Sequence, residues 1–588
     1  MTTRAQMEQL ARTGFAFAGQ TIARVDLAGA ALAGVDFAGA TLQDLDLRGA
    51  DLSGARLSGA TILEVDLTGA SLEGADLTGA KLLGVDLTNV RMARSTINGA
   101  KMIAPILTGA DLTGAELNEA ALPGARLEGA CLRDATITGA ALRLAKLAGA
   151  DLSGARIVGS SLDEADLSGA RLDGASLERC SLVSATLVGA ALATASLDKV
   201  VLLRADLRGV TLPRAMTGVI LNEARLSALD LSAARLEGGE LEDLKLEGDP
   251  ALNFEGASLQ RCSLAGLSLR GANFHGADLT SAVLIGCDLR GADLTDAKLE
   301  GASLMEARLD GVDLSGRELK LLALQRASLR GAKLRGAQLS LTMLNDADLR
   351  GADLSHAHIS KAILRGAKLE GARLSGATLE GVSFDGVDFS ALEFTGLDLP
   401  RCSFRECDLE ARRFTDCDLS GCNFERANLK GAVFHGCELA RACFKEADLT
   451  GASLRGQGLK MVFFGGATLT GAVFAEARLG HAVFLETNAE AANFVAADLK
   501  KSVWTRANLR AAELTGAALV HADLSHADVS HAELSHADLS HANLHNLKDE
   551  RARYTGANRS GARKTDLDRI QAEAWLPRAH AQAQRRRR

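Results

Sequence analysis

Aromatic residues and proline are scarce in this chain of 588 residues. Aromatic residues make up 4% of the chain, with one Tyr and two Trp, and there are 6 prolines, although 47% of the residues are hydrophobic. Several ordinary globular domains of this total length would carry more large side chains in their cores, so the composition argues against them. The 60 glycines and the abundance of small residues indicate a repeat architecture instead.

A strong excess of charge and a long apolar run are also missing. The net charge of -8 is modest for this length, so the whole chain is not expected to attract nucleic acid or an anionic membrane. The first twenty residues hold Arg4, Glu8 and Arg12 and no apolar core of signal-peptide length, which predicts a cytoplasmic protein. The longest uncharged stretch, 180–197, is rich in Ala, Ser, Thr and Gly, so no membrane span is predicted.

What the sequence does contain is a five-residue period. A large apolar residue, usually Leu and here called the centre, falls at nearly every fifth position from Phe17 to Leu212, and Ala usually stands two positions before it. The phase shifts by one residue near 213–216, and the segment 247–253 breaks it again. From Phe254 to Leu544 the period then continues without any insertion or deletion, so no loop that could carry an active site was inserted there.

The units ADLSG at 50–54, ADLTG at 75–79, ADLRG at 347–351 and ANLKG at 427–431 resemble the A(D/N)LXX unit of the pentapeptide repeat family. The resemblance covers roughly nine-tenths of the chain, with about a hundred tandem units. It implies an all-β fold, a right-handed quadrilateral parallel β-helix with about twenty residues per coil and both the centre and the preceding small residue pointing inward. Short helical termini complete the expected fold class.

An even number of faces also follows from the residues themselves. Between 404 and 504, Phe or Trp occupies nearly every second centre and Leu nearly every centre between. Four faces let each class stack on itself from coil to coil, whereas three would mix large with small and leave voids. The expected domains are an N-terminal helical cap, a first array, a break, a second array and a basic tail with a short helix, at 1–14, 15–246, 247–253, 254–545 and 546–588.

Residue types that often carry chemistry are absorbed by this repeat. The histidines at 521, 526, 531, 536 and 541 lie two residues after a centre, at outward corners, and only His521 and His541 share a corner. Two histidines without further converging ligands do not predict a metal site. Eight of the ten cysteines, all but Cys131 and Cys443, take the small inward position and are expected to be free thiols. We therefore expect no catalytic residue, no cofactor, no bound metal and no enzyme activity.

Arg412 and the C-terminal segment depart from the pattern. Arg412 occupies an inward small-residue position, so we expect the coil to flare locally and its guanidinium to reach solvent or an acid such as Glu410 or Asp416. Near the other end, Thr565 and Asp568 predict a helix N-terminus before LDRIQAEAW. This segment caps the solenoid, dimerises, binds an acidic partner or is a disordered end.

The sequence favours a non-catalytic bacterial scaffold, a rigid β-helical rod that displays docking surfaces for an unidentified protein. The resemblance implies an alternative, because family members with an assigned activity mimic B-DNA and protect DNA gyrase. Residues 1–246 hold 23 Lys and Arg against 30 Asp and Glu, which is far from the charge density of a duplex. A third reading, an accessory role in a secreted toxin or effector system, follows only from the resemblance.

Two candidate surfaces follow from stepping by twenty residues. The position after each centre on one face of the first array predicts an outward apolar strip about 10 Å long at Leu63, Leu83 and Ile103, with Ile106 around the corner and Val183 and Leu203 further along. A protein partner, a second copy of the chain in a homodimer, the C-terminal helix or the N-terminal segment would cover it. A basic ladder is expected at Arg270, Arg290, Arg330 and Arg350, partly neutralised by Asp288 and Asp348, so direct binding of nucleic acid is not expected.

Overall fold

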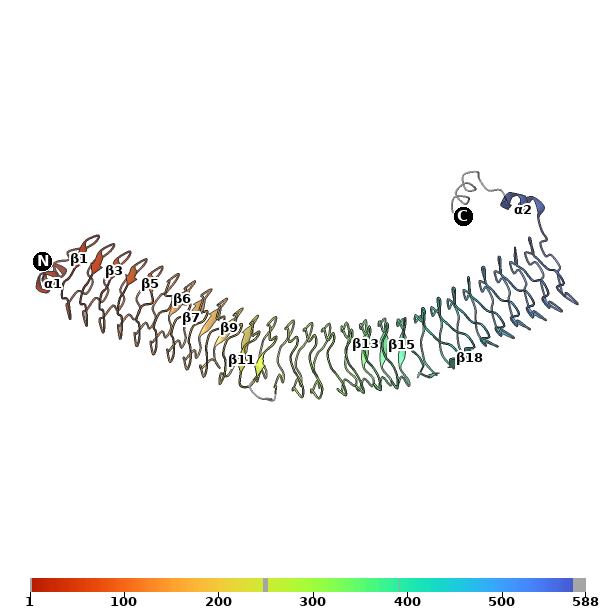
Figure 1. Ribbon diagram of the computed structural model, residues 1–588, viewed down its shortest axis with the longest axis horizontal. Coiled ribbons are helices and arrows are strands. Elements are labelled where there is room, and N and C mark those ends of the chain that lie inside the picture. Colours follow the sequence, from red (N-terminus) through yellow and green to blue (C-terminus); the bar gives the residue numbers. More distant parts are fainter. Residues whose placement is uncertain (1–2, 247–251, 391, 575–588) are drawn as a thin grey trace. The chain divides into compact units, whose positions relative to one another are not determined.

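The computed structural model describes residues 3–246, 252–390 and 392–574. It confirms the predicted fold, because the chain winds as a four-sided parallel β-helix in successive coils (Figure 1). Parallel bridges join residues twenty positions apart, as in Asp26↔Asp46 and Asp46↔Asp66, so one coil contains four repeats. The chain divides into two compact units, Met1–Leu304 and Met305–Arg588.

Each repeat contributes one buried centre, one buried small residue and one corner. Leu27 is 1% exposed and Ala30 is fully buried. The carbonyl of Leu27 accepts a hydrogen bond of 2.9 Å from the N–H of Ala30, and Gly29 between them has a φ of 65°. This is the turn that needs a left-handed third residue, which glycine adopts without strain. Burying each centre stabilises the coil by about 1.5–3 kcal/mol before the cost of ordering the chain.

The first unit begins with helix α1, Arg4–Arg12. Thr3 and Gln6 form a capping box at its start. Met7 is buried, and the Arg4 guanidinium donates to the carbonyls of Ala28 and Gly29, so α1 covers the first coils. The strands of this unit form parallel sheets in the orders β1-β2-β3-β4-β5, β10-β9-β8-β7-β6 and β11-β12. Their bounds are Thr21–Ala23, Thr41–Gln43, Thr61–Leu63, Lys81–Leu83 and Lys101–Ile103 for β1 to β5, Thr136–Thr138, Arg156–Val158, Ser176–Glu178, Ser196–Asp198 and Ala215–Thr217 for β6 to β10, and Arg225–Leu226 and Lys245–Leu246 for β11 and β12.

The two irregularities in the period become local changes in one continuous ladder. At the phase shift, Leu197 pairs with Met216, nineteen positions away. Across the break, Asp230 pairs with Asn253, twenty-three positions away. Most of that break, 247–251, lies outside the described residues. Because bridges cross it, the end of the first array and the start of the second belong to the same unit.

The second unit contains the sheets β13-β14-β15 and β16-β17-β18, and helix α2 is its last described element. The predicted aromatic columns form here as stacks, since Phe424 lies 5.1 Å from Phe404 and 4.8 Å from Phe444, with ring planes within 7°. Phe414, on the column of the alternate centres, meets Phe424 edge to face at 83°. The elements span Gln338–Ser340, His358–Ser360, Thr378–Glu380, Phe394–Thr395, Arg413–Thr415 and Val433–His435 for β13 to β18, and Leu567–Ala574 for α2.

The ladder extends past 545, where the second array was expected to end. Bridges continue to Asn543↔Arg563, because Ala552, Ala557 and Ala562 keep the small positions. The centres of this last coil are polar, and the Arg559 guanidinium lies 4.6 Å from the centre of the Tyr554 ring. Polar and charged centres in the last coil reduce the apolar cross-section that this end of the solenoid would otherwise expose.

Helix α2 begins one residue after Asp566, whose carboxylate accepts from the N–H groups of Asp568 and Arg569. The expected start at Thr565 and Asp568 is therefore corrected to an N-cap at Asp566. Leu567 on its apolar side is 71% exposed. Within the described ranges, both helices are too short and too polar to cross a bilayer.

Candidate functional site

The predicted apolar strip lies on the sheet formed by β1 to β5. Leu63, Leu83 and Ile103 are direct register partners on β3, β4 and β5. Their neighbours Ile62, Leu82 and Met102 point into the core, so the strip residues point outward. Exposure rises along the strip, because Leu63 is half-buried, Leu83 is 40% exposed and Ile103 is 66% exposed. Pro123, exposed in the following coil, continues it.

The two borders of the strip differ in chemistry. On one side, Lys81 and Lys101 are exposed register partners on β4 and β5. Neither has an ion-pair partner among the residues that the structure describes. On the other side the corner residues Gly84 and Ala104 are small, whereas the corner residue beside Leu63 is Glu64, whose carboxylate lies against Gly84. Aligned like charges repel each other, so this face carries two unpaired positive charges beside exposed apolar side chains.

The other residues predicted for this surface are less exposed. Ile106 lies on the next face, bridged to Asp86, and is half-buried. Val183 and Leu203 belong to adjacent coils, where the N–H of Ser184 donates to the carbonyl of Leu203, and both side chains are half-buried. Charged residues at the equivalent position of the intervening coils separate them from the strip. The structure thus brings three of the six residues into one continuous line.

In the first unit one of the two arginines of the basic ladder is neutralised. Arg290 contacts the Asp288 carboxylate with two nitrogens, and its Nε lies 2.7 Å from Oδ1. Arg270 is exposed and has no ion-pair partner in the described part of the chain. Paired arginines present little net charge to a phosphate backbone.

In the second unit, Arg330 and Arg350 converge on one carboxylate. The Arg330 Nε lies 2.6 Å from Oδ2 of Asp348, and the Arg350 Nη2 lies 2.7 Å from the same oxygen. The Arg350 hydrogen bonds, followed by those of Arg330, hold the pKa of the Asp348 carboxyl well below its usual range. This is the charge pairing expected from the sequence.

The cysteines occupy the positions predicted for them. All ten are free thiols, eight of them buried and only Cys131 and Cys443 half-exposed. The buried thiols find an acceptor in the preceding coil, as when the Cys402 Sγ lies 2.8 Å from the carbonyl of Leu379. Burial raises the pKa of the Cys402 thiol to about 12 and that of Cys262 to about 11. Thiols this weakly acidic are poor nucleophiles and poor metal ligands at neutral pH.

Arg412 leaves the core, but its partner differs from the two acids expected. Its Nη1 donates to the carbonyl of Ser390 at 2.8 Å, and its charge lowers the pKa of Asp388 after the larger effect of hydrogen bonds from Ser390. The ladder has no bridge at Asp388 or Glu393, so the described part of this coil is open there. The guanidinium therefore extends through the opening and contacts the preceding coil instead of an acid of its own coil.

The five histidines lie at the corners of the coil, as predicted from the sequence. The φ angles of the five lie between 59° and 64°, in the left-handed region. His521 and His541 stack with ring centres 5.0 Å apart, and all but His526 are exposed. Sequence reasoning missed His545, which is 2% exposed, and Glu573 on α2, which meets both His526 and His545. The available signal was that His545 follows His541 by four residues and leaves the five-residue histidine series.

Sequence comparisons with known protein families agree with the repeat seen in the structure. A sequence profile described as "Pentapeptide repeat region" matches residues 377–454. A second, "Pentapeptide repeats (8 copies)", matches residues 23–59, 64–93, 97–134, 106–143, 145–182, 175–214, 252–284, 282–316, 324–360, 353–390, 464–500, 492–529 and 519–548. No curated protein matches the chain.

Several solved structures are similar to parts of this chain. QnrB1, a plasmid-mediated fluoroquinolone resistance protein, is 22% identical over 34% of this chain and 98% of its own, with a TM-score of 0.20. HetL, from the cyanobacterium Nostoc sp. strain PCC 7120, is 26% identical over 56% of this chain and 89% of its own, with a TM-score of 0.09. A protein of the Arabidopsis thaliana thylakoid lumen is 26% identical over 21% of this chain and 70% of its own, with a TM-score of 0.14.

The profile matches extend over most of the chain. They coincide with coils whose bridges repeat every twenty residues and whose centres are buried leucines and phenylalanines. The chain belongs to the pentapeptide repeat family.

Proposed function

We propose that this protein is a non-catalytic scaffold that binds a protein partner through the strip formed by Leu63, Leu83 and Ile103. The observation that carries the proposal is the alignment of Leu83 and Ile103, exposed on adjacent strands, beside the exposed lysines Lys81 and Lys101. Single exposed leucines are common on proteins, but aligned ones next to unpaired like charges are unfavourable for an uncovered surface.

The chemistry of this face defines the partner. A matching surface carries apolar side chains along one line and carboxylates along the side that meets the two lysines. The backbone of the strip is held by ladder hydrogen bonds to the coils on both sides, such as those from Glu64 to Leu83 and from Ala104 to Pro123. The scaffold therefore loses little conformational entropy when the partner docks.

The test compares three variants with the wild type. Leu63→Ser, Leu83→Ser and Ile103→Ser combined in one chain should remove the bound protein, because these side chains supply the apolar contact. Lys81→Glu with Lys101→Glu should weaken binding and reduce its dependence on salt. Leu144→Ser is the matched control, since Leu144 is 48% exposed but lies at a corner outside the strip.

Each variant is immobilised at equal density, and proteins retained from cell extract are quantified by mass spectrometry, while light scattering reports self-association. Circular dichroism confirms that the coil is intact. Loss of the same retained protein from both strip variants but not from the control supports the proposal. Equal retention by all four chains would remove this face as the docking surface.

The alternative that the family resemblance implies, protection of DNA gyrase, is tested with the same chains. A DNA mimic needs a dense line of carboxylates at the binding surface, whereas the strip is apolar and bordered by lysines. A gyrase supercoiling assay, with and without an inhibitor, should therefore show no protection of gyrase by the wild type. Protection by the wild type would replace the present proposal.

A further inference from the structure

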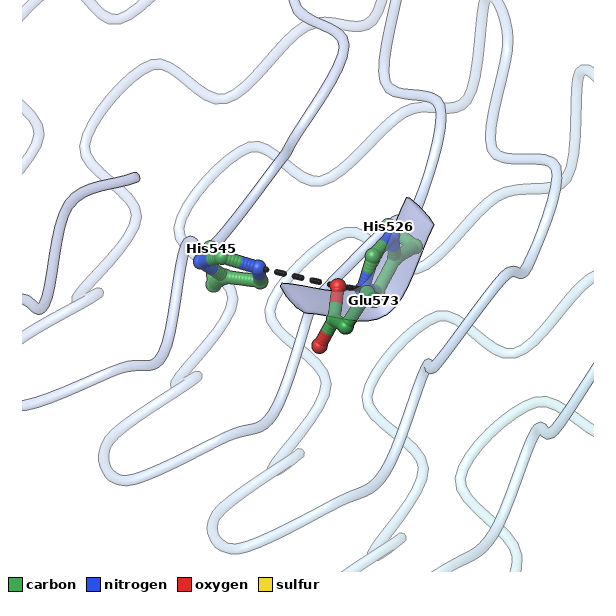
Figure 2. A group of neighbouring side chains, drawn as sticks. All are labelled: His526, His545 and Glu573. Carbon is green, nitrogen blue, oxygen red and sulfur yellow. Dashed lines mark hydrogen bonds and ion pairs between the residues drawn. The ribbon is translucent and has the colours of Figure 1, made fainter. Parts of the chain in front are cut away.

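Helix α2 meets the solenoid at a cluster of three groups that could ligate a metal ion. His526 stands at a corner, His545 lies one residue after a centre in the next coil, and Glu573 projects from the last turn of α2 (Figure 2). The Nε2 atoms of His526 and His545 lie 3.0 and 3.3 Å from Oε2 of Glu573. Two imidazoles and a carboxylate therefore converge on one point.

The cluster is ordered by neighbouring groups. The Arg569 Nε lies 2.7 Å from Oε1 of Glu573, which leaves Oε2 for the two rings. The Nδ2 of Asn546 lies 3.0 Å from Nδ1 of His526 and fixes that ring so that its Nε2 faces the carboxylate. In this arrangement Nδ1 of His526 accepts from the Asn546 amide and the ring proton lies on Nε2, so metal binding at Nε2 requires the Asn546 side chain to turn its oxygen toward Nδ1.

Burial separates this cluster from the other histidines. His545 is 2% exposed, and the side chain of His526 is 23% exposed, whereas the corner residues His531 and His536 are exposed. His521 and His541 stack on each other but gather no third ligand in the described part of the chain. Three ligands within reach of one another occur only at the start of the last coil, among the residues described.

We propose that His526, His545 and Glu573 bind a divalent transition metal ion of the Zn²⁺ class. The ligand atoms all lie within 4.8 Å of one another, so modest side-chain rotations place them about 2.0–2.2 Å from a shared ion. Two imidazole nitrogens select Zn²⁺ or Co²⁺ over Mg²⁺ and Ca²⁺, which prefer oxygen ligands. The ion ties α2 to two successive coils and leaves a fourth position for water.

Metal binding would change the tautomer of His545. Its Nδ1 accepts a hydrogen bond of 3.2 Å from the N–H of Asp566, so its proton is on Nε2, which faces Glu573. A metal at Nε2 requires that proton to move to Nδ1, where it would face the Asp566 N–H. Metal binding must therefore release this long hydrogen bond, and the amide of Asp566 should become less protected while the amides within α2 become more protected.

The experiment titrates the metal-free full-length chain with Zn²⁺ by calorimetry and with Co²⁺ by visible absorption. The wild type should bind one equivalent of metal ion. The affinity for this ion should fall at least tenfold in Glu573→Gln and in His526→Ala. The controls His531→Ala and His536→Ala should bind as the wild type does. Mg²⁺ should give no signal.

The variants also distinguish a true three-ligand site from adventitious binding. Unchanged affinity in Glu573→Gln, loss of binding in His521→Ala, or no binding by the wild type at micromolar Zn²⁺ would each overturn the proposal. Hydrogen exchange with and without Zn²⁺ gives a second readout, because binding elsewhere would leave the amides of Asp566 and α2 unchanged. Glu573 is on the surface, so its amide variant should fold as the wild type does.

Discussion

The aromatic column through Phe424 allows a direct measurement of the coil period. Phe424 is fully buried between Phe404 and Phe444, with ring centres 5.1 and 4.8 Å away. Phe464, two coils from Phe424, stacks on Phe444 at 5.1 Å. Replacing two phenylalanines of this column by Leu, singly and together, measures which pairs are in contact.

The expected energies follow from these contacts. Phe424→Leu keeps a buried apolar side chain but loses two stacked partners, each contributing about 0.5–1.5 kcal/mol beyond burial, so it should cost about 1–3 kcal/mol. Combined with Phe444→Leu, the loss should be smaller than the sum by about 0.5–1.5 kcal/mol, because their shared contact is lost only once. Combined with Phe464→Leu, the two losses should add to within about 0.5 kcal/mol.

Native-state hydrogen exchange at the amides between Phe424 and Phe444 is the suitable assay. A solenoid opens locally, and its coils contact mainly their neighbours, so a single global unfolding free energy does not describe it. Additive effects for Phe424 and Phe444, or equal coupling between Phe424 and Phe464, would refute the twenty-residue stack.

Two further predictions concern the small inward position. Burial raises the pKa of most of the inward thiols, with Cys402 at about 12. A thiol reagent at pH 8 should therefore label Cys131 and Cys443 rapidly in the folded chain and the other eight cysteines only after unfolding. Rapid labelling of all ten would contradict the buried positions. Arg412→Ala should leave thermal stability equal or higher and increase amide protection at Asp388 and Glu393, because Ala fits a position where Arg forces the coil open; lower stability would show that the site is not strained.

Most of the fold could be predicted from the sequence because one geometric rule acts at every repeat. The centre and the small residue before it must point inward for each coil to bury its core, so the period predicts the burial of nearly every residue. The alternation of Phe and Leu centres then required an even number of faces, in agreement with the four that the family resemblance implies. For the same reason Leu63, Leu83 and Ile103 could be placed in register, and the eight inward cysteines could be distinguished from Cys131 and Cys443.

The period could not predict contacts made by segments that leave it. His545 contacts Glu573 on α2, a helix whose position no repeat determines. The last coil was missed because its centres are polar, although its alanines keep the register. The partner of Arg412 depends on how far the preceding coil opens, which follows from the packing of several side chains and not from the identity of residue 412 alone.

The separation between inward and outward positions also bears on the strip. In each repeat, stability comes from the centre, the small residue and the corner turn, while the residues beside the centre face outward and contact mainly their equivalents twenty positions away. A polar residue at 63, 83 or 103 would serve the fold as well, as Gln43 does at the equivalent position of the preceding coil. The ladder therefore gives no structural reason for apolar side chains at these three positions, and binding of a partner supplies one.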